Sequence, residues 1–346
     1  MWLSAARVIT AGRKRPARRL RPVAAILAAL APLLLSTGCD PFSSQSNDPV
    51  LTVAAVPGIN DANLYLAQHD GYFSKEHIKV RIQRYRSVSD EIAALSNGNV
   101  DVIAADYGDM FNAVAVSKQP NHPVFKILAD GYDAAAGVTE IVTMPDSSVN
   151  QPTKLAGLTI PAPDSQQISV PVGDPTTLAV ASTVSVLQSD GVNLAATQWK
   201  PMTQQQEITR LTTGQAQAVL VSGVGVYDAQ KAGAVELLDG ASGPTSGIPL
   251  DGFFASSGWL SEPKNATAAL DFQHAIYNAD AGATMPGPIQ AILPAWTGVS
   301  KQEADLVTTG TYPLSTITSN IQRTADLMDN EGMTTIEVNV ANMVFR

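Results

Sequence analysis

Two stretches of this sequence share one pattern: residues 91–103 read EIAALSNGNVDVI and residues 207–219 read EITRLTTGQAQAV. Each stretch begins as a helix, stops at a glycine (Gly98 or Gly214), and continues after a short link as a strand. The spacing of 116 residues places one copy in each half of the chain. We therefore expect two α/β domains of similar build that face each other across a cleft. The alternative is that two unrelated helix–strand units share a glycine stop by chance.

Around these copies, runs typical of strands alternate with helical segments. Strands are expected at 51–56, 78–85, 100–105, 125–129, 158–161, 197–200 and 216–221, with helices at 61–70, 90–97, 110–118, 176–190 and 204–213. Strands alternating with helices of this length are typical of parallel βαβ units. Beyond 252–255 the segments are helical, roughly at 263–281, 286–293, 301–306 and 318–331. They cannot extend a parallel sheet, so we expect them to pack on the first domain and make it discontinuous.

The first 38 residues predict a secretory signal. They hold seven Lys and Arg residues and no acidic one, and residues 22–35 are almost entirely Ala, Leu, Val, Ile and Pro. This apolar run is too short to span a bilayer of about 30 Å as a permanent helix. Cys39 follows directly and resembles the lipidated cysteine of bacterial lipoproteins, and the polar residues 40–49 read as a flexible tether. A plain secretory signal with an incidental cysteine is the alternative.

Composition excludes several classes of function. Of the 22 Lys and Arg residues, 15 remain after residue 38 against 31 Asp and Glu residues, so the rest of the chain is strongly acidic. Such a surface repels phosphate backbones, and we expect no nucleic-acid partner. Cys39 is the one cysteine, so the chain cannot build a disulfide, a thiolate zinc site or a redox pair by itself.

A family resemblance appears at residues 64–80, LYLAQHDGYFSKEHIKV. Its core of Ala67 and Gly71-Tyr72-Phe73 resembles the segment after the first strand in solute-binding proteins of ABC importers, in the group that serves nitrate, taurine, aliphatic sulfonates and thiamine pyrimidine precursors. Residues 93–102 and 154–160 are similar to later motifs of that group. The group's fungal relatives are enzymes with cysteine-rich signatures, which this chain lacks.

The resemblance implies an α/β, two-lobed, periplasmic-binding-protein-like (type II) fold with a hinge and a ligand cleft between the lobes. We expect a signal peptide over 1–38, a lipidated cysteine and tether over 39–49, a first lobe of 50–137 plus 252–346, and a second lobe of 138–251. The implied function is the substrate-binding component of an ABC-type importer, a monomer held by its lipid at the outer face of the bacterial cytoplasmic membrane. The implied partners are a small-molecule ligand, the ABC permease and the membrane.

Candidate ligand contacts lie where strands lead into helices. In open α/β sheets ligands bind beyond the carboxyl ends of strands, where helix N-termini point free N–H groups into the crevice. These junctions and the aromatic residues near them give the candidates Asn60, Asp61, Ser87, Ser89, Asp106, Tyr107, Asp133, Thr176, Ser222, Gly223 and Phe254. The repeat maps Asp106 onto Ser222, so these two are expected to face each other. For each polar candidate the alternative is that it only caps its helix.

No catalytic residue, cofactor or metal is expected, because the four histidines fall in no ligand spacing and no nucleophile elbow or phosphate-loop motif appears. Helix N-termini favour an anion such as a sulfonate, whereas the candidate aspartates oppose one. The balance favours a neutral or amine-bearing molecule, such as a heterocycle that stacks on Tyr107, Tyr132 or Phe254. Two alternatives stay open: a secreted or surface-anchored enzyme that uses the cleft carboxylates, and a surface sensor module.

Overall fold

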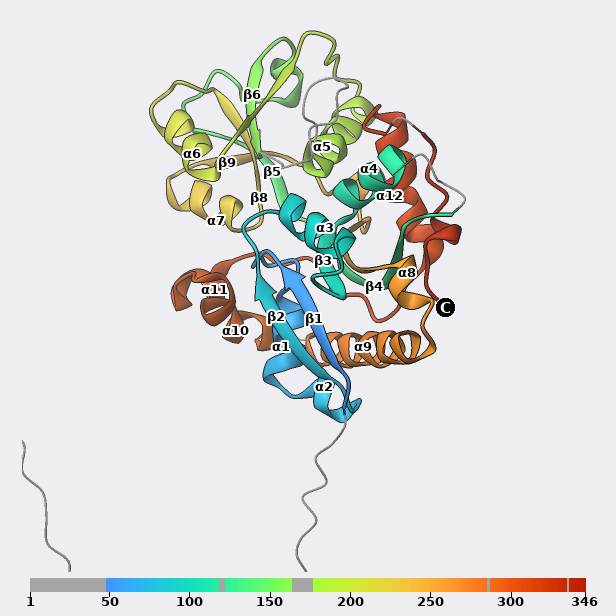
Figure 1. Ribbon diagram of the computed structural model, residues 1–346. Helices are drawn as coiled ribbons and strands as arrows, with labels where there is room; N and C mark the ends of the chain where they lie inside the picture. Colours follow the sequence, from blue (N-terminus) through green and yellow to red (C-terminus); the bar gives the residue numbers. More distant parts are fainter. Residues whose placement is uncertain (1–47, 118–121, 164–176, 285–286, 335) are drawn as a thin grey trace, which may run out of the picture. The chain divides into compact units, whose positions relative to one another are not determined.

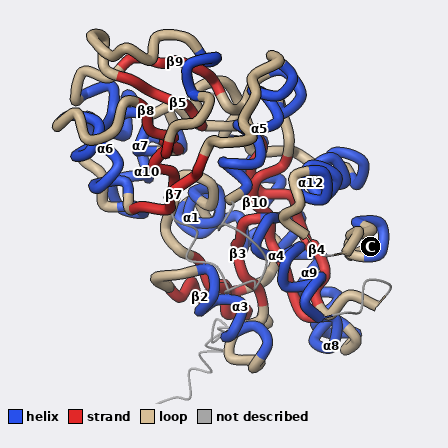
Figure 2. The backbone as a smooth tube through the Cα atoms, turned by 90° about the horizontal axis from the view of Figure 1, so that it is seen from above, coloured by secondary structure: helices blue, strands red, loops and turns tan. Residues whose placement is uncertain are grey.

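The structure is a computed structural model that describes residues 48–346 except 118–121, 164–176, 285–286 and 335. Cys39 and Thr176 therefore lie outside the described residues. Two groups of strands organise the described part, and we name the elements around them the first lobe and the second lobe. Figure 2 shows these groups apart from each other, with β3, β4 and β10 in one and β5, β8 and β9 in the other.

The first lobe is built on a five-stranded sheet in the order β2-β1-β3-β10-β4. Its strands are β1 (Val50–Ala55), β2 (Lys79–Arg84), β3 (Val102–Asp106), β4 (Phe125–Asp133) and β10 (Pro249–Ser256). β1 pairs in parallel with β2 and β3, as the sequence predicts. β10 is antiparallel to both of its neighbours. The sequence analysis predicts a parallel sheet without this strand. The chain leaves this sheet at the carboxyl end of β4 and returns at the same edge, so β10 must run the opposite way.

The second lobe holds two smaller sheets. In the first, β5 (Thr139–Thr143) lies between β8 (Ala218–Ser222) and β9 (Val235–Asp239) and is antiparallel to both. In the other, β6 (Thr159–Pro163) pairs in parallel with β7 (Gln198–Met202). The sequence analysis did not predict β5 or β9. Every residue of β5 is buried, yet its sequence, TEIVT, is mostly polar, so it shows neither alternation nor the continuous apolar run of a buried strand.

Helices cover both faces of the first sheet (Figure 1). One face packs against α1 (Ala62–His69), α2 (Tyr72–Lys75), α9 (Pro263–Gly282) and α10 (Pro288–Thr297), and the other against α3 (Val88–Ser96), α4 (Tyr107–Ser117) and α12 (Thr318–Asn330). The remaining helices are α5 (Leu178–Ser189), α6 (Gln204–Thr212), α7 (Val224–Lys231), α8 (Ser257–Leu260) and α11 (Lys301–Leu306), with 3-10 turns η1 (Pro152–Leu155), η2 (Gly243–Thr245) and η3 (Val340–Asn342). The side chains of β1 divide between the faces: Leu51 and Val53 join one core and Ala54 the other.

The internal repeat is present in the structure residue for residue. α6 begins and ends 116 residues beyond α3, and β8 begins and ends 116 residues beyond β3. Gly98 and Gly214 follow the two helices with φ angles of 70° and 71°, the left-handed region that glycine adopts without strain. The two lobes therefore each place a helix–strand pair of the same form beside the other lobe.

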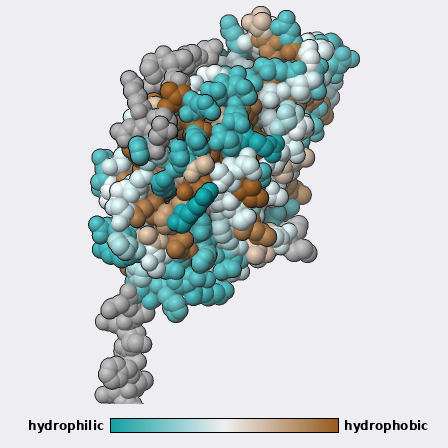
Figure 3. All heavy atoms as spheres, turned by 90° about the vertical axis from the view of Figure 1, so that its right-hand side faces the viewer, coloured by the Kyte–Doolittle hydropathy of each residue, from teal (hydrophilic) through white to brown (hydrophobic). Residues whose placement is uncertain are grey.

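The chain crosses between the lobes twice, at residues 134–138 after β4 and at residues 240–248 before β10. Arg323 of α12 ties the second crossing down, because its Nη2 donates hydrogen bonds to the carbonyl oxygens of Pro244 and Ser246. In the part of the chain that the structure describes, we find no helix with the length and apolar character needed to cross a bilayer. On the face in Figure 3, hydrophilic side chains predominate and hydrophobic ones lie between them in small groups.

Candidate functional site

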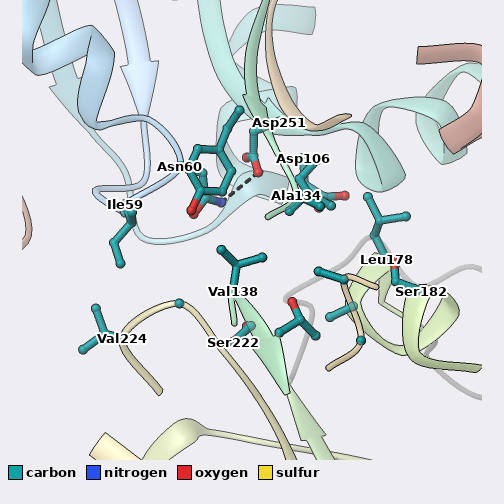
Figure 4. A pocket seen from close by; sticks show the side chains of 18 of the residues that line it. Ile59, Asn60, Asp106, Ala134, Val138, Leu178, Ser182, Ser222, Val224 and Asp251 are labelled. Carbon is teal, nitrogen blue, oxygen red and sulfur yellow. Dashed lines mark hydrogen bonds between the residues drawn. The ribbon is translucent and has the colours of Figure 1, made fainter. Parts of the chain in front are cut away.

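A cavity of about 270 Å³ lies between the two lobes and is lined by both. The first lobe contributes the loop after β1, the end of β3 and the start of β10, and the second lobe contributes α5, the end of β8 and the loop after β9. Figure 4 shows Asn60, Asp106 and Asp251 on one side and Ser182, Ser222 and Val138 on the other. The volume is slightly below the usual range for ligand pockets, so the cavity suits a small molecule.

Two aspartates form the polar wall of the first lobe. Asp106 ends β3, and Asp251 lies directly opposite it in the β3–β10 register. Asn60 Nδ2 donates a 2.8 Å hydrogen bond to Asp251 Oδ2 (Figure 4). Because the two carboxyl groups are neighbours on adjacent strands, the charge of one opposes ionisation of the other.

The pKa values of both aspartates are raised, chiefly by burial. Burial, and then the charge of Asp106, raise the pKa of Asp251 well above its ordinary value. Burial raises the pKa of Asp106 to about 6, against the hydrogen bonds that Asp106 accepts from the backbone. Both carboxyl groups therefore hold a proton more tightly than an ordinary aspartate does.

Asp106 also caps α4. Its Oδ1 accepts hydrogen bonds from the backbone N–H groups of Gly108, at 2.6 Å, and Asp109, at 3.2 Å. A Cβ atom at Gly108 would lie 2.6 Å from this oxygen, so a side chain there would displace the carboxylate. The two cap bonds use only Oδ1, and Asp106 lines the cavity.

The opposite wall is mostly apolar with a few hydroxyl groups. Val138, Leu178 and Ala179 line it, together with Ser182 of α5 and Ser222 at the end of β8. Ser182 is only 4% exposed, and its Oγ has no hydrogen-bond partner among the described residues. A buried hydroxyl without a partner is unfavourable, so this position would gain from a ligand group that completes a hydrogen bond.

The cavity lining is acidic in composition, because it includes Asp106 and Asp251. Among the described residues, none of those that line it is Lys, Arg or His. Asp61 lies behind the first-lobe wall, where burial raises its pKa to about 7 although it accepts hydrogen bonds from Trp296 Nε1 and Gly58 N. Burial, and then the charge of Asp61, raise the pKa of Glu91 of α3 to about 10. The first lobe thus concentrates carboxyl groups at this edge of its sheet.

Four of the residues expected from the sequence line the cavity: Asn60, Asp106, Ser222 and Gly223. Asp106 and Ser222, paired by the repeat, lie on opposite walls. Gly223 begins α7 with a φ angle of 55° and reaches across the cleft towards Ile59, whose Cδ1 lies 4.0 Å from where a Cβ of Gly223 would be.

The other described candidates lie elsewhere. Tyr107 is fully buried: its hydroxyl donates to Asp130 Oδ1 at 3.0 Å, and its ring packs edge-on against Phe254, at 5.4 Å between centroids. Ser87 caps α3 by accepting from Asp90 N. Asp61, Ser89 and Asp133 do not line the cavity. The stacking surface expected from Tyr107 and Phe254 is therefore part of the core, whereas Tyr132 does line the cavity.

Sequence reasoning missed Asp251, Ser182, Leu178 and Gln204 as lining residues. Asp251 follows no parallel strand, and its place opposite Asp106 depends on the register of β10. Ser182 and Leu178 lie in a helix whose sequence reads as an ordinary apolar segment, LAVASTVSVLQS. A polar residue at the centre of such a helix is the available signal for Ser182.

The family model described as NMT1/THI5 like matches residues 59–241, more than half of the chain. The chain belongs to the NMT1/THI5-like family. This confirms the resemblance seen in the sequence. Among curated protein sequences, none matches this NMT1/THI5-like protein significantly.

Solved structures of binding proteins share the fold of this NMT1/THI5-like protein. The ligand-binding component of an ABC-type import system from Staphylococcus aureus, with zinc bound, is 14% identical over 86% of this chain and 96% of its own, with a TM-score of 0.65. The alkanesulfonate-binding protein SsuA from Xanthomonas axonopodis pv. citri, bound to MOPS, is 14% identical over 86% and 98%, with a TM-score of 0.64.

The periplasmic nitrate-binding protein NrtA from Synechocystis PCC 6803 is 13% identical over 85% of this chain and 86% of its own, with a TM-score of 0.61. At these identities the likeness is one of fold. The comparisons confirm the expected α/β, two-lobed, periplasmic-binding-protein-like fold.

Proposed function

We propose that this NMT1/THI5-like protein is the substrate-binding component of an ABC-type importer, which captures a small organic solute between its lobes and delivers it to a membrane permease. The observation that carries the proposal is the cavity of about 270 Å³ lined by both lobes. The fold shared with the ligand-binding component of an ABC-type import system supports it.

The proposed mechanism is closure about a hinge. A ligand that contacts both walls is bound more tightly by the closed form than by the open form, so binding shifts the population to the closed form. The moving bodies are the predicted lobes, residues 50–137 plus 252–346 and residues 138–251. Their support is that β1–β4 and β10 form one sheet, whereas β5–β9 form the other two. A micromolar ligand needs about 8 kcal/mol of binding free energy.

Export and anchoring belong to the same proposal. The basic and apolar start of the chain and the single cysteine that follows it support a signal peptide over 1–38 and a lipid on Cys39. The protein then works as a monomer at the outer face of the bacterial cytoplasmic membrane. Incorporation of radiolabelled palmitate into the wild-type protein, and its loss in Cys39→Ala, tests the anchor.

A second function rests on the adjacent carboxyl groups of Asp106 and Asp251, which are register partners and both line the cavity. Two neighbouring carboxyl groups whose pKa values are raised by burial are groups that acid–base catalysis uses. Under this alternative, the protein would convert its ligand instead of only holding it. Mass spectrometry of the ligand after prolonged incubation with the protein separates the two functions.

The test uses the protein from Asp40 onward and a panel of small anions, neutral molecules and cations. We expect at least one compound to raise the melting temperature, to lower the radius of gyration in small-angle X-ray scattering, and to be recovered unchanged. Ser222→Ala and Asp106→Ala should weaken its binding at least tenfold, and Asp329→Asn, on the exposed side of α12, should not. Recovery of a chemically altered compound, or binding without closure, would contradict the proposal.

A further inference from the structure

We propose that the solute is a small organic cation, an amine or amidine whose N–H groups are held by the carboxyl groups of Asp106 and Asp251; this rests on the proposed function. The inference concerns the ligand class alone, and an importer for an anion or a neutral molecule would leave the proposed function standing.

The first argument is the geometry of the acidic wall. Asp106 and Asp251 are register partners on β3 and β10, and both line the cavity. Asn60 engages Oδ2 of Asp251, and the backbone of α4 engages Oδ1 of Asp106, so both carboxyl groups are held in place before a ligand arrives. The second oxygen of each is not engaged by these bonds. Two carboxyl groups held side by side at the cavity wall suit a ligand group that carries positive charge and donates N–H.

The second argument is the absence of compensating positive charge. None of the described lining residues is basic, and residues 164–176, which the structure does not describe, contain no Lys, Arg or His in their sequence. Arg84 lowers the pKa of Asp61 and Arg323 that of Asp133, and neither arginine lines the cavity. A sulfonate or nitrate in the cavity would meet Asp106 with no opposing cation, which disfavours an anionic ligand.

The third argument comes from the wall of the second lobe. Ser182 Oγ is buried, lines the cavity and has no partner among the described residues. Leu178 lies beside it, and Val138 lines the same cavity farther from it (Figure 4). The ligand therefore has a cationic end for the first lobe, an apolar body, and a polar atom within reach of Ser182. In a cavity of about 270 Å³ this describes a single ring or a short chain.

The experiment compares probes of one shape and different charge. Benzylamine and benzamidine are the cations, benzyl alcohol and benzamide the neutral partners, and benzoate and benzenesulfonate the anions; putrescine, choline, taurine, MOPS and nitrate widen the panel. We expect the tightest binder, by thermal shift and calorimetry, to be a cation. Asp106→Asn and Asp251→Asn should each lower its affinity at least tenfold, and Ser182→Ala should lower it severalfold.

Asp329→Asn removes one charge from an exposed position and should change the affinity less than twofold. Circular dichroism and the melting temperature of each variant separate misfolding from lost contacts, and a fall in affinity with added salt gives a second readout of ligand charge on the wild-type protein. Closure around a neutral or anionic probe, with no cation binding as tightly, would overturn this inference and keep the proposed function. Absence of any binding across the panel would count against both.

Discussion

Buried carboxyl groups dominate this molecule at the scale of single residues. Burial raises the pKa of Asp61 to about 7, of Asp106 to about 6 and of Asp133 to about 7. The folded state therefore binds these protons more tightly than the unfolded chain, whose aspartates ionise near pH 4. As the pH rises from about 4 to about 7, the unfolded chain releases protons first, and the folded state loses stability.

We therefore expect the melting temperature, without ligand, to fall by several degrees between about pH 4.5 and about pH 7.5. Scanning calorimetry across this range measures it. Asp61→Asn keeps an oxygen for the hydrogen bonds from Trp296 and Gly58 but has no charge to bury, so its profile should be flatter than that of the wild type. A melting temperature that rises over this range would show that these groups ionise freely in the folded protein.

Local order in the sequence was enough to place some candidate residues at the cavity, although their contact with a ligand stays a prediction. Asp106 and Ser222 follow strands that the repeat identifies, and both line the cavity. Asp251 and Ser182 could not be found in this way, because their places depend on the register of β10 and on which side of α5 turns to the cleft. The polar residues at the ends of strands were visible, but the sequence did not distinguish a cap such as Ser87 from a lining residue such as Asn60.

At the scale of helices and strands, the elements that nearby residues determine could be predicted, and those that depend on distant parts of the chain could not. The helices α3 and α6 and the glycines after them follow from periodicity and stop signals, which nearby residues set. The antiparallel direction of β10 depends instead on where the chain returns after more than 100 residues of second lobe. β5 was missed because its short sequence, TEIVT, shows neither alternation nor the continuous apolar run that identifies a buried strand.

β10 also constrains what its residues can be. A Cβ atom at Gly252 would lie 2.7 Å from the hydroxyl oxygen of Tyr107 and 3.1 Å from the carbonyl oxygen of Ala129. Tyr107 cannot easily move away, because it is buried and bonded to Asp130. We expect Gly252→Ala to lower the free energy of unfolding by about 1–3 kcal/mol in urea titrations.

The matched control for this substitution is Gly258→Ala in α8, where a Cβ would meet nothing within 4 Å. Alanine favours helix over glycine, so this variant should be neutral or slightly more stable. Equal losses in the two variants would mean that the approach of Tyr107 to β10 is not what restricts position 252.

At the scale of the whole molecule, the family and the two-lobed fold could be predicted because family motifs and the repeat lie in short segments. The charge of the cavity could not be predicted, because it depends on side chains that are far apart in sequence, such as Asn60, Asp106 and Asp251. The candidate aspartates favoured a neutral or amine-bearing ligand but did not distinguish between the two. The absence of basic lining residues became visible once the described walls were assembled.

The position of β10 predicts how a shortened chain behaves. Without residues 249–346, β3 and β4 lose the strand between them, whereas every strand of the second lobe is kept. Limited proteolysis of a fragment of residues 48–248 should therefore digest the first-lobe segments and spare residues 139–239. Survival of residues 48–133 as a resistant piece would show that the first sheet forms without β10.

Because β10 lies between β3 and β4, the order in which the chain emerges from the ribosome differs from the order in which its parts can be finished. The edges of β3 and β4 that pair with β10 stay unpaired until residue 256 has been made. Unpaired strand edges can pair with the wrong strands. The second lobe lies between β4 and β10 in the chain, so its strands are all made before β10 completes the first sheet. A newly made chain thus spends most of its synthesis with its N-terminal sheet unfinished.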